Sequence, residues 1–417
     1  MKIGLIIIGD ELLSGTTQDC NMLYLGEKLR RMGLDLHEVT VIKDEATAIG
    51  EAFKAALEKY DITFCSGGLG PTIDDRTKNA LATFLNVKLE DNESARKLAH
   101  HHYERRGLEW NPELNNYHLI PKGVTPFPNP KGMAPGLHLT LENKELLCAP
   151  GVPREFQSMV DEFLEGHQAT RNFEQRNYLT IRTAGIPEEQ IFNHKCPTLW
   201  KTLSAFGSVS SYPRFTGIDI VINDIKIEEK ELIRKLENLE ELKPIENHVW
   251  HIGNGEIEEI VIEFAKKNHF TLSSAESCTG GLIAHQLTEV SGSSDAFWGS
   301  VVSYDNSVKE NVLGVSKLSL EKFGAVSDEV AEQMAKGVRE KLNTTYGVST
   351  SGIAGPLGGS AEKPVGTVAI SICGPKGNRT KTYHIPPIFD RDEMKKRFAT
   401  RALVSLYKQM RLDLSES

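Results

Sequence analysis

Hydrophobic residues along this chain fall into short continuous runs, separated by longer segments in which they recur at helical spacing. Short apolar runs are typical of buried strands, and apolar residues three and four positions apart are typical of helices. Over residues 1–168 this pattern predicts strands at 2–8, 36–42 and 62–65 and helices at 22–32 and 46–57. Alternating strands and helices predict a mostly parallel sheet, in which ligands bind beyond the carboxyl ends of the strands.

A similar alternation returns in the last third of the chain. It predicts helices at 256–267, 328–341 and 391–410 and strands at 269–273, 296–303, 346–351 and 365–372. The segment between differs, with strands predicted at 178–182 and 218–222 and one charged helix at 228–242. We therefore expect an α/β protein with two α/β domains (1–168 and 255–417) of mostly parallel or mixed sheets, joined by a small α+β domain (172–250).

Composition narrows the class of protein. A chain of 417 residues with 39% hydrophobic and 25% charged residues is typical of a soluble globular protein. The net charge is −9 and no block of Lys or Arg stands out, so direct nucleic-acid binding is not expected. The apolar run at residues 3–8 is too short for a signal peptide or a membrane span. We expect a cytoplasmic location, reduced thiols for the six scattered cysteines, and no zinc site.

The most informative polar segment is the octet SAESCTGG at residues 274–281. Its paired glycines, Gly280 and Gly281, would let backbone N–H groups approach an anion or a developing oxyanion. Ser277 is a candidate nucleophile, and Cys278 is its rival because a thiolate is intrinsically more nucleophilic than a hydroxyl. A capped strand–turn–helix junction without chemistry is the alternative. The octet alone does not decide between these interpretations.

Other polar residues follow predicted strands of the same domain. Tyr304 would lie at a strand end, Lys309 on the next helix, and the turn at residues 352–355 after a further strand. No histidine near these motifs stands out as a base for Ser277, but a lysine whose pKa is lowered by desolvation can serve, with Tyr304 assisting. Arg391, at the start of the last helix, could hold a phosphate. Together these residues favour an acyl-transfer site.

The N-terminal domain contains a glycine-rich loop of its own. The segment SGGLGPTIDDRT at residues 66–77 follows a predicted strand and precedes a helix. Gly67, Gly68 and Gly70 predict a phosphate-binding loop, because such loops aim backbone N–H groups at an anion. The segment is neither a P-loop, which would need a following Gly-Lys-Ser/Thr, nor a dinucleotide fingerprint, whose glycine spacing differs.

Four carboxylates lie near this loop in the predicted sheet. Asp74 and Asp75 begin the next helix, and Asp10 and Glu11 follow a neighbouring strand. They could hold a divalent cation beside a phosphate, since hard cations prefer carboxylate oxygens; capping of the helix is the alternative for the two aspartates at residues 74 and 75. Three consecutive histidines at 100–102 would point in different directions on a helix, so we interpret them as a solvated face rather than a metal site.

These motifs together resemble those of the CinA family of competence/damage-inducible proteins, over essentially the whole chain. The resemblance is carried by GDELLSG (9–15), SGGLGPTIDDRT (66–77), APG (134–136), APGVPREF (149–156), AESCTGG (275–281), SGIAGP (351–356) and EKPVGTV (362–368). It implies a molybdopterin-binding-like first domain, a middle domain of KH type and a homodimer. For the last domain it implies a deamidase that converts nicotinamide mononucleotide to nicotinate mononucleotide and ammonia, without a cofactor.

The resemblance also implies roles for individual residues. In the last domain Ser277 would be the nucleophile and Tyr304 and Lys309 would assist. Substrate or oxyanion would contact Thr279, Gly280, Gly281, Gly352, Ala354, Gly355 and Arg391. The first domain would split ADP-ribose into AMP and ribose 5-phosphate with a divalent metal (Mg, Mn or Co). Its metal ligands would be Asp10, Glu11, Asp74 and Asp75, with Gly67, Gly68 and Gly70 at the pyrophosphate.

Two departures from the family pattern affect the first domain. Met133 stands where the family usually has a threonine, and a family glutamine near position 118 is missing. The loss of the threonine hydroxyl removes a possible hydrogen bond to substrate. The alternatives are therefore a first domain that binds a pterin or nucleotide without hydrolysing it, or a protein that acts mainly as a partner in competence.

Overall fold

The computed structural model describes residues 1–72, 75–170 and 177–415, and these form two compact units. The first unit ends at Asn177, and the second, from Tyr178, contains both the middle segment and the C-terminal segment. None of the helices in the described residues combines the length and apolarity that crossing a membrane requires.

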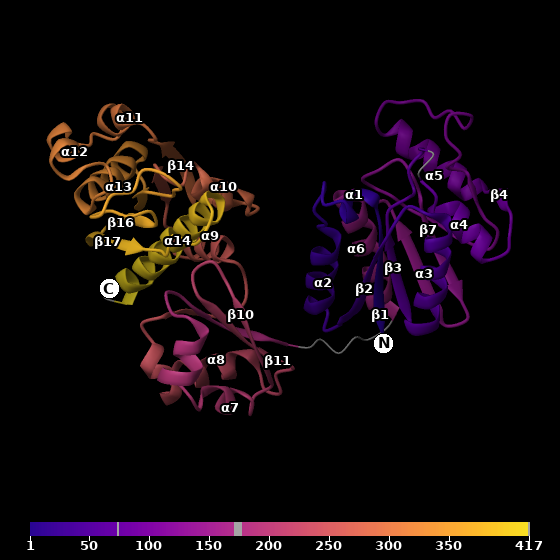
Figure 1. Cartoon of the computed structure of the whole chain (residues 1–417), viewed down its shortest axis with the longest axis horizontal. Helices are drawn as coiled ribbons and strands as arrows, with labels where there is room; N and C mark the ends of the chain where they lie inside the picture. Colours follow the sequence, from indigo (N-terminus) through magenta and orange to yellow (C-terminus); the bar gives the residue numbers. More distant parts are fainter. Residues whose placement is uncertain (73–74, 171–176, 416–417) are drawn as a thin grey trace. The chain divides into compact units, whose positions relative to one another are not determined.

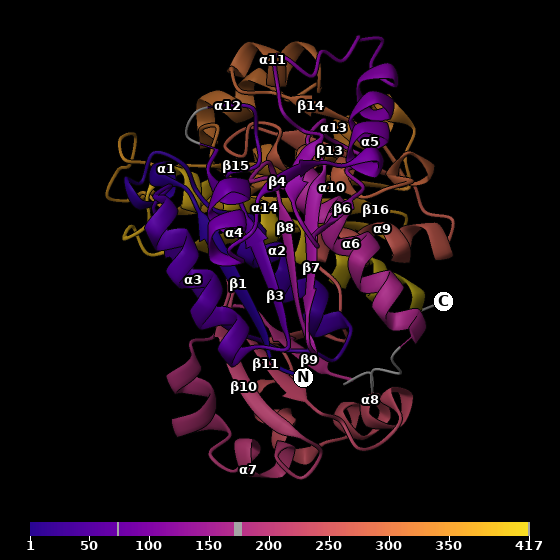
Figure 2. The same cartoon turned by 90° about the vertical axis from the view of Figure 1, so that its right-hand side faces the viewer.

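The first unit is built on a six-stranded sheet in the order β2-β1-β3-β8-β7-β6. Its strands are β1 (Ile3–Ile8), β2 (Leu36–Ile42), β3 (Ile62–Ser66), β6 (Thr125–Phe127), β7 (Gly136–Leu141) and β8 (Lys144–Ala149). Strands β2, β1, β3 and β8 are parallel, whereas β7 and β6 run antiparallel to their neighbours. Figure 2 looks onto this sheet. The carboxyl ends of the four parallel strands therefore meet at one edge.

Helices cover both faces of this sheet (Figure 1). Side chains of β1 alternate between the faces, with Leu5 and Ile7 in one core cluster and Ile6 and Ile8 in the other. The first cluster is completed by α2 (Asn21–Arg31) and α6 (Pro153–Thr170), and the second by α3 (Ala46–Lys59) and α4 (Thr77–Phe84). The remaining elements are α1 (Asp10–Leu13), β4 (Leu89–Asp91), α5 (Glu93–Glu104) and β5 (Leu119–Pro121).

The middle segment forms an antiparallel sheet in the order β10-β11-β9-β12. Its strands are β9 (Leu179–Thr183), β10 (Ser208–Pro213), β11 (Ile218–Asn223) and β12 (Val249–Ile252). Its helical elements are the π-helix η1 (Gln190–Lys195), α7 (Leu199–Leu203), α8 (Glu229–Glu237) and the 3₁₀-helix η2 (Glu240–Ile245). The single helix predicted at 228–242 is wrong: α8 ends at a C-cap, Asn238, and Leu239 is extended before η2 begins.

Burial explains why the middle and C-terminal segments form one unit. Every residue of β9 is buried, so both faces of the strand are covered. One face packs against the segment's own helices, and Ala184 and Trp250 belong instead to the core of the C-terminal segment. The segment is α+β, as expected; the assignment to KH type stays a prediction.

The C-terminal segment has a five-stranded sheet in the order β14-β13-β15-β16-β17. Its strands are β13 (Leu272–Glu276), β14 (Phe297–Val302), β15 (Tyr346–Gly352), β16 (Thr367–Gly374) and β17 (Gly377–His384). Strands β14, β13 and β15 are parallel, and β16 and β17 are antiparallel. The mixed sheets of both units confirm the predicted α/β class.

Helices on one face of this sheet are α9 (Ile257–Lys267), α10 (Leu282–Glu289) and α14 (Arg391–Ser415), and α13 (Asp328–Leu342) covers the other. Shorter helices are η3 (Ser293–Asp295), α11 (Asn306–Asn311) and α12 (Lys317–Phe323). The strand predicted at 269–273 lies three residues later. The chain must first turn after α9, and His269 makes this turn in the left-handed conformation (φ 56°).

Candidate functional sites

The first three residues of the octet, 274–276, form the end of the buried strand β13 and are not part of a loop. Glu276, the last residue of β13, is fully buried. Its carboxylate accepts hydrogen bonds from the backbone N–H groups of Gly281, Ile283 and Ala284 at 2.9, 3.0 and 2.9 Å. These are amides at the start of α10, which have no partner inside the helix. Glu276 therefore ties the turn to the sheet and occupies this helix N-terminus itself.

We expect the substitution Glu276→Gln to lower the free energy of unfolding by about 2–3 kcal/mol, because a charged acceptor would give way to an amide that offers an N–H group to the same donors. Urea denaturation measures this change. The control is Glu289→Gln at the exposed end of α10, where a change within about 0.5 kcal/mol is expected. Equal stability of the two variants would contradict the structural role of Glu276.

The neighbouring side chains of Ser277 and Cys278 have different surroundings. Cys278 lies in the core, and burial raises the pKa of its thiol to about 12. At neutral pH it is almost entirely the protonated, weakly nucleophilic form. Ser277 donates its amide N–H to the carbonyl of Thr350 at 3.0 Å, and its hydroxyl is hydrogen-bonded to no described residue. Both residues are buried, with 9% of Ser277 and 5% of Cys278 exposed, so it is the unpartnered hydroxyl, and not greater exposure, that favours Ser277 as the nucleophile.

The remaining residues of the turn are fixed by the backbone. Gly280 and Gly281 adopt positive φ values of 62° and 96°, which glycine tolerates best. Their amides donate to the carbonyl of Ser277 and to Glu276, so neither N–H is free in this state. The buried Thr279 hydroxyl lies 2.8 Å from the hydroxyl of Thr350 on β15. The turn is thus rigidly attached to the carboxyl end of the neighbouring strand.

Lys309 is buried, with 1% of its surface exposed. Its ammonium group donates to the carbonyls of Ser303 and Tyr304 at 2.8 and 3.2 Å, directly after β14. Burial lowers the pKa of this lysine, and its charge acts on the Cys278 thiol, so it lies beside the octet. No hydrogen bond within the described residues joins Lys309 to the hydroxyl of Ser277.

Three of the predicted residues are brought together at a second point. Arg391 donates to the carbonyl of Gly355 at 2.5 Å and to the hydroxyl of Tyr304 at 3.0 Å. Gly352 is closely packed, since a Cβ there would lie 2.7 Å from the carbonyl of Thr367. The methyl group of Ala354 belongs to the core, so only its backbone could face a ligand.

Lys395 is a residue that the sequence did not single out. The position a Cβ of Gly280 would occupy lies 3.8 Å from the Lys395 ammonium group, near the start of α14. The octet, Lys395 and Arg391 therefore share this end of the C-terminal segment. Because both cations are on one helix, they could together attract a phosphate.

The first unit contains a cavity of about 720 Å³ at the carboxyl edge of its parallel strands. It is lined by the glycine-rich loop and by side chains of both charges: Glu11, Asp44, Asp75, Glu155, Arg106, Lys131 and Arg154. Tyr103 and Tyr117 add aromatic surface. Its volume lies within the range of small-ligand sites, about 300–1,000 Å³. Asp44, Arg106 and Lys131 belong to no motif that the sequence singled out.

The glycines of the loop permit close packing. A Cβ on Gly67 would lie 2.3 Å from the carbonyl of Ile8, and one on Gly68 would lie 2.2 Å from the hydroxyl of Thr77. The amides of Gly67 and Gly70 already donate within the protein, to Ala149 and Asp75. These glycines therefore bring the loop close to the sheet, and two of the three expected amides are not free for a phosphate.

The predicted metal ligands are only partly assembled. Asp75 accepts hydrogen bonds from its own loop, from the amides of Gly70 and Thr72 at 2.7 and 2.9 Å. Glu11 lines the cavity, Asp10 begins α1, and Asp74 lies outside the described residues. The described residues contain no group of three or more His, Cys, Asp or Glu side chains that could hold a metal ion. The metal site stays a prediction.

A buried asparagine supports the part of the cavity wall that contains Gly132, Ala134 and Glu155. Asn129 donates to Glu155 and to the carbonyl of Ala134, each at 2.8 Å, and accepts from the amide of Gly132 at 2.7 Å. A Cβ on Gly132 would lie 1.8 Å from the Glu155 carboxylate, so this position requires glycine. Met133 lines the cavity beside it, where it offers an apolar side chain.

The same network corrects one expectation from the sequence. The three histidines were expected to form a solvated face, but His102 is buried. Its ring nitrogens face the carbonyl of Met133 at 3.1 Å and the amide of Asn129 at 3.4 Å. His102 lies on the buried face of the amphipathic helix α5, whereas His100 and His101 are exposed. His102 therefore supports the cavity wall.

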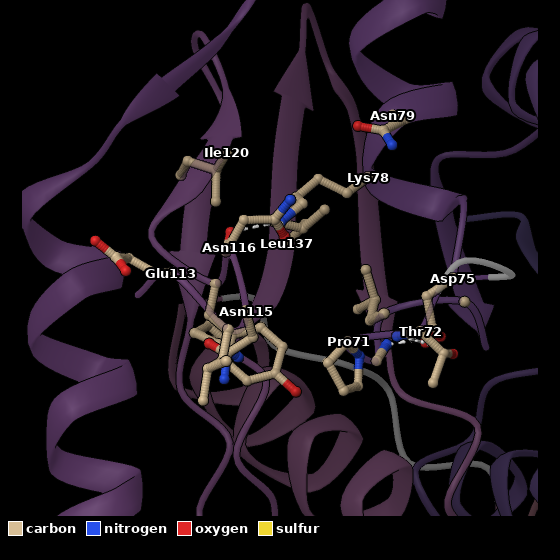
Figure 3. A pocket seen from close by; sticks show the side chains of 16 residues that line it. Pro71, Thr72, Asp75, Lys78, Asn79, Glu113, Asn115, Asn116, Ile120 and Leu137 are labelled. Carbon is tan, nitrogen blue, oxygen red and sulfur yellow. Dashed lines mark hydrogen bonds between the residues drawn. The ribbon is translucent and has the colours of Figure 1, made fainter. Parts of the chain in front are cut away.

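A smaller cavity of about 370 Å³ adjoins the first (Figure 3). Lys78 of α4 reaches across it, and its ammonium group donates to the carbonyl and the side-chain oxygen of Asn116, both at 2.7 Å. Burial lowers the pKa of Lys78 to about 8. Gly68, Asp75 and other residues of the glycine-rich loop line both cavities. Lys78 is a further cation beside the loop that the sequence did not identify.

Comparison with known proteins identifies the same two segments. Residues 4–169 match the model of a probable molybdopterin binding domain, and residues 254–410 match that of the CinA C-terminal domain. The competence-damage inducible protein of Thermoanaerobacter sp. (strain X514) is 36% identical, over 89% of this chain and 90% of its own length. The CinA-like protein of Salinibacter ruber (strain DSM 13855 / M31) is 35% identical, over 97% of this chain and 98% of its own.

Solved structures of CinA proteins are similar to part of this chain. The crystal structure of the competence/damage inducible protein CihA from Agrobacterium tumefaciens is 40% identical and covers 37% of this chain and 94% of its own, with a TM-score of 0.35.

Proposed function

Since this chain belongs to the CinA family, we propose that its C-terminal segment hydrolyses the carboxamide of nicotinamide mononucleotide to nicotinate mononucleotide and ammonia. The observation that carries the proposal is that the Ser277 hydroxyl, which has no hydrogen-bond partner in the described residues, follows β13, while the buried Lys309, whose pKa is lowered, lies on α11 after the adjacent strand β14. A serine needs such a base, because its hydroxyl is a weak nucleophile at neutral pH.

In the proposed reaction the Ser277 oxygen attacks the carboxamide carbon and its proton passes to neutral Lys309. Collapse of the tetrahedral intermediate breaks the C–N bond, and the same proton leaves with ammonia. Water then hydrolyses the acyl-enzyme and restores the serine hydroxyl. The two carbonyls that bind Lys309 use both hydrogens of a neutral amine and leave its lone pair to take the proton. Arg391 and Lys395 would attract the substrate phosphate.

Ammonia release from nicotinamide mononucleotide by the purified full chain tests this function. We expect ammonia and nicotinate mononucleotide in equal amounts, without added metal. Release of nicotinamide instead of ammonia, or no turnover, would overturn the proposal.

For the first unit we propose a nucleotide site in the 720 Å³ cavity, with hydrolysis of ADP-ribose to AMP and ribose 5-phosphate. Support comes from the cations beside the glycine-rich loop, which suit phosphates, and from Glu11, Asp44 and Glu155, which suit ribose hydroxyls or an attacking water. The hydrolysis would require a divalent metal; because the described residues do not assemble three metal ligands, we assign no individual step to that metal.

Incubation with ADP-ribose, with magnesium, manganese, cobalt or a chelator, separates hydrolysis from binding. We expect AMP in at least one metal and none with the chelator. Binding of ADP-ribose without AMP in any of the metals would instead support a binding module in this unit.

A further inference from the structure

A cavity of about 410 Å³ lies in the second unit, between the middle segment and the end of the C-terminal segment. Its walls come from residues 184–185 and 247–248, from β17 and from α14. It shares no lining residue with the octet or with Tyr304, Lys309 and Arg391. Its volume falls in the range of small-ligand sites, about 300–1,000 Å³. We call it the cationic cavity, for the reason that follows.

Three cationic side chains line the cationic cavity: Lys381, Arg401 and Lys408. Arg401 and Lys408 are seven residues apart on α14, so they share one face of the helix. Lys381 lies two residues before Tyr383 on β17, on the same face of the strand. The Tyr383 ring holds two of the cations in place, with Lys381 at 5.2 Å and Arg401 at 5.1 Å from its centroid.

These cations have no carboxylate to neutralise them, because the residues that line the cavity, all of them described, include no Asp or Glu. The Nε of Arg401 is buried and has no hydrogen-bond partner in the described residues, and its Nη2 makes a long contact of 3.4 Å to the carbonyl of Thr216. Lys408 donates to the carbonyl of Asn247 at 3.0 Å. Burial, with Arg401 and Lys381 nearby, lowers the pKa of Lys408.

The backbone at Gly185 leaves room for the side chain of Arg401. Gly185 has a φ of 71°, and a Cβ there would lie 3.3 Å from Nη2 of Arg401. A side chain at this position would therefore press on the guanidinium group from the middle segment. The cations are thus held by Tyr383 and by two carbonyls of the middle segment, and Gly185 leaves space for Arg401. A bound anion would relieve the repulsion between these cations.

We propose that the cationic cavity binds a small molecule that carries a phosphate or diphosphate group. Three cations suit a ligand with two or more negative charges, and the guanidinium group of Arg401 suits the oxygens of a phosphate. The volume exceeds the needs of an inorganic ion and accommodates an organic group beside the phosphate. Such a ligand would join the middle segment to α14 and β17. This site is independent of the function proposed for the octet.

The test is protection of the lysines from an amine-acetylating reagent, measured residue by residue by peptide mass spectrometry on the full chain. The probes are pyrophosphate, AMP and adenosine at equal ionic strength. With a probe at about ten times its Kd, acetylation of Lys381 and Lys408 should slow about tenfold, by simple occupancy. Lys376, exposed beside the same hairpin, is the internal control. Because the readout is local, binding at the other two sites does not affect it.

Protection by pyrophosphate and AMP, or by AMP alone, supports the proposal, and protection by pyrophosphate alone supports an inorganic ligand of the same chemistry. Unchanged acetylation with both, or equal protection by adenosine, overturns it. A second measurement uses Lys381→Met, at an exposed position of β17, with Lys376→Met as the matched control. The probe that protects the lysines should also raise Tm, and this rise should be smaller in Lys381→Met than in Lys376→Met. Ser277→Ala should show the same rise as the parent, which would exclude binding at the octet as its cause.

Discussion

Replacing Ser277 by alanine is expected to lower kcat/KM for ammonia release from nicotinamide mononucleotide by about a thousandfold or more, as when other covalent nucleophiles are removed. The reason is geometric: the Ser277 hydroxyl has no described partner, so its loss removes the attacking oxygen without breaking a hydrogen bond of the fold. The coupled assay for ammonia measures the change, and urea denaturation should show nearly unchanged stability.

Cys278→Ala is the matched control for this prediction. Because Cys278 lies in the core, we expect a loss of about 1 kcal/mol of stability from the smaller side chain, with kcat/KM within a few-fold of the parent. If Cys278→Ala abolished turnover while Ser277→Ala kept it, the thiol would be the nucleophile, in spite of its burial.

Lys309→Met should lower kcat/KM by about a hundredfold or more and also change its dependence on pH. In the parent, activity should rise with pH as the buried lysine loses its proton, at a pKa below the ordinary 10.5. The variant should lack this rise. A pH–rate profile measured over the stability range of both proteins distinguishes the loss of a base from general damage to the site.

Lys309→Met should also change how the free energy of unfolding depends on pH. The folded-state pKa of Lys309 is lowered, so between it and 10.5 the unfolded chain binds more protons and stability rises with pH. Below both values the cost of the buried charge is fully present. Lys309→Met removes this cost, so any stability it gains at neutral pH should diminish as the pH rises. Lys317→Met, at an exposed position of α12, should change neither property.

The elements that the sequence predicted are those whose patterns are local. The apolar run of β1 and the helical spacing of α3 each contain the information that places them in the core. The pattern erred where a break depended on packing, as between α8 and η2, and where a turn shifted the start of β13. The octet shows what local sequence does not reveal. It contains a serine, a thiol and a carboxylate, but its sequence does not indicate which of these side chains is buried or hydrogen-bonded.

Tertiary structure decided which of these groups can react. It buried Cys278 in the core, used Glu276 to hold the start of α10, and left the Ser277 hydroxyl without a partner. It also assembled Arg401 and Lys381 from separate elements into a cavity that no motif marks. By itself, the sequence determined the α/β class, the family and the segments that carry the sites, because periodicity and motifs are written in neighbouring residues. Burial, charge pairing and pKa depend on residues distant in the chain, so only the folded structure determines them.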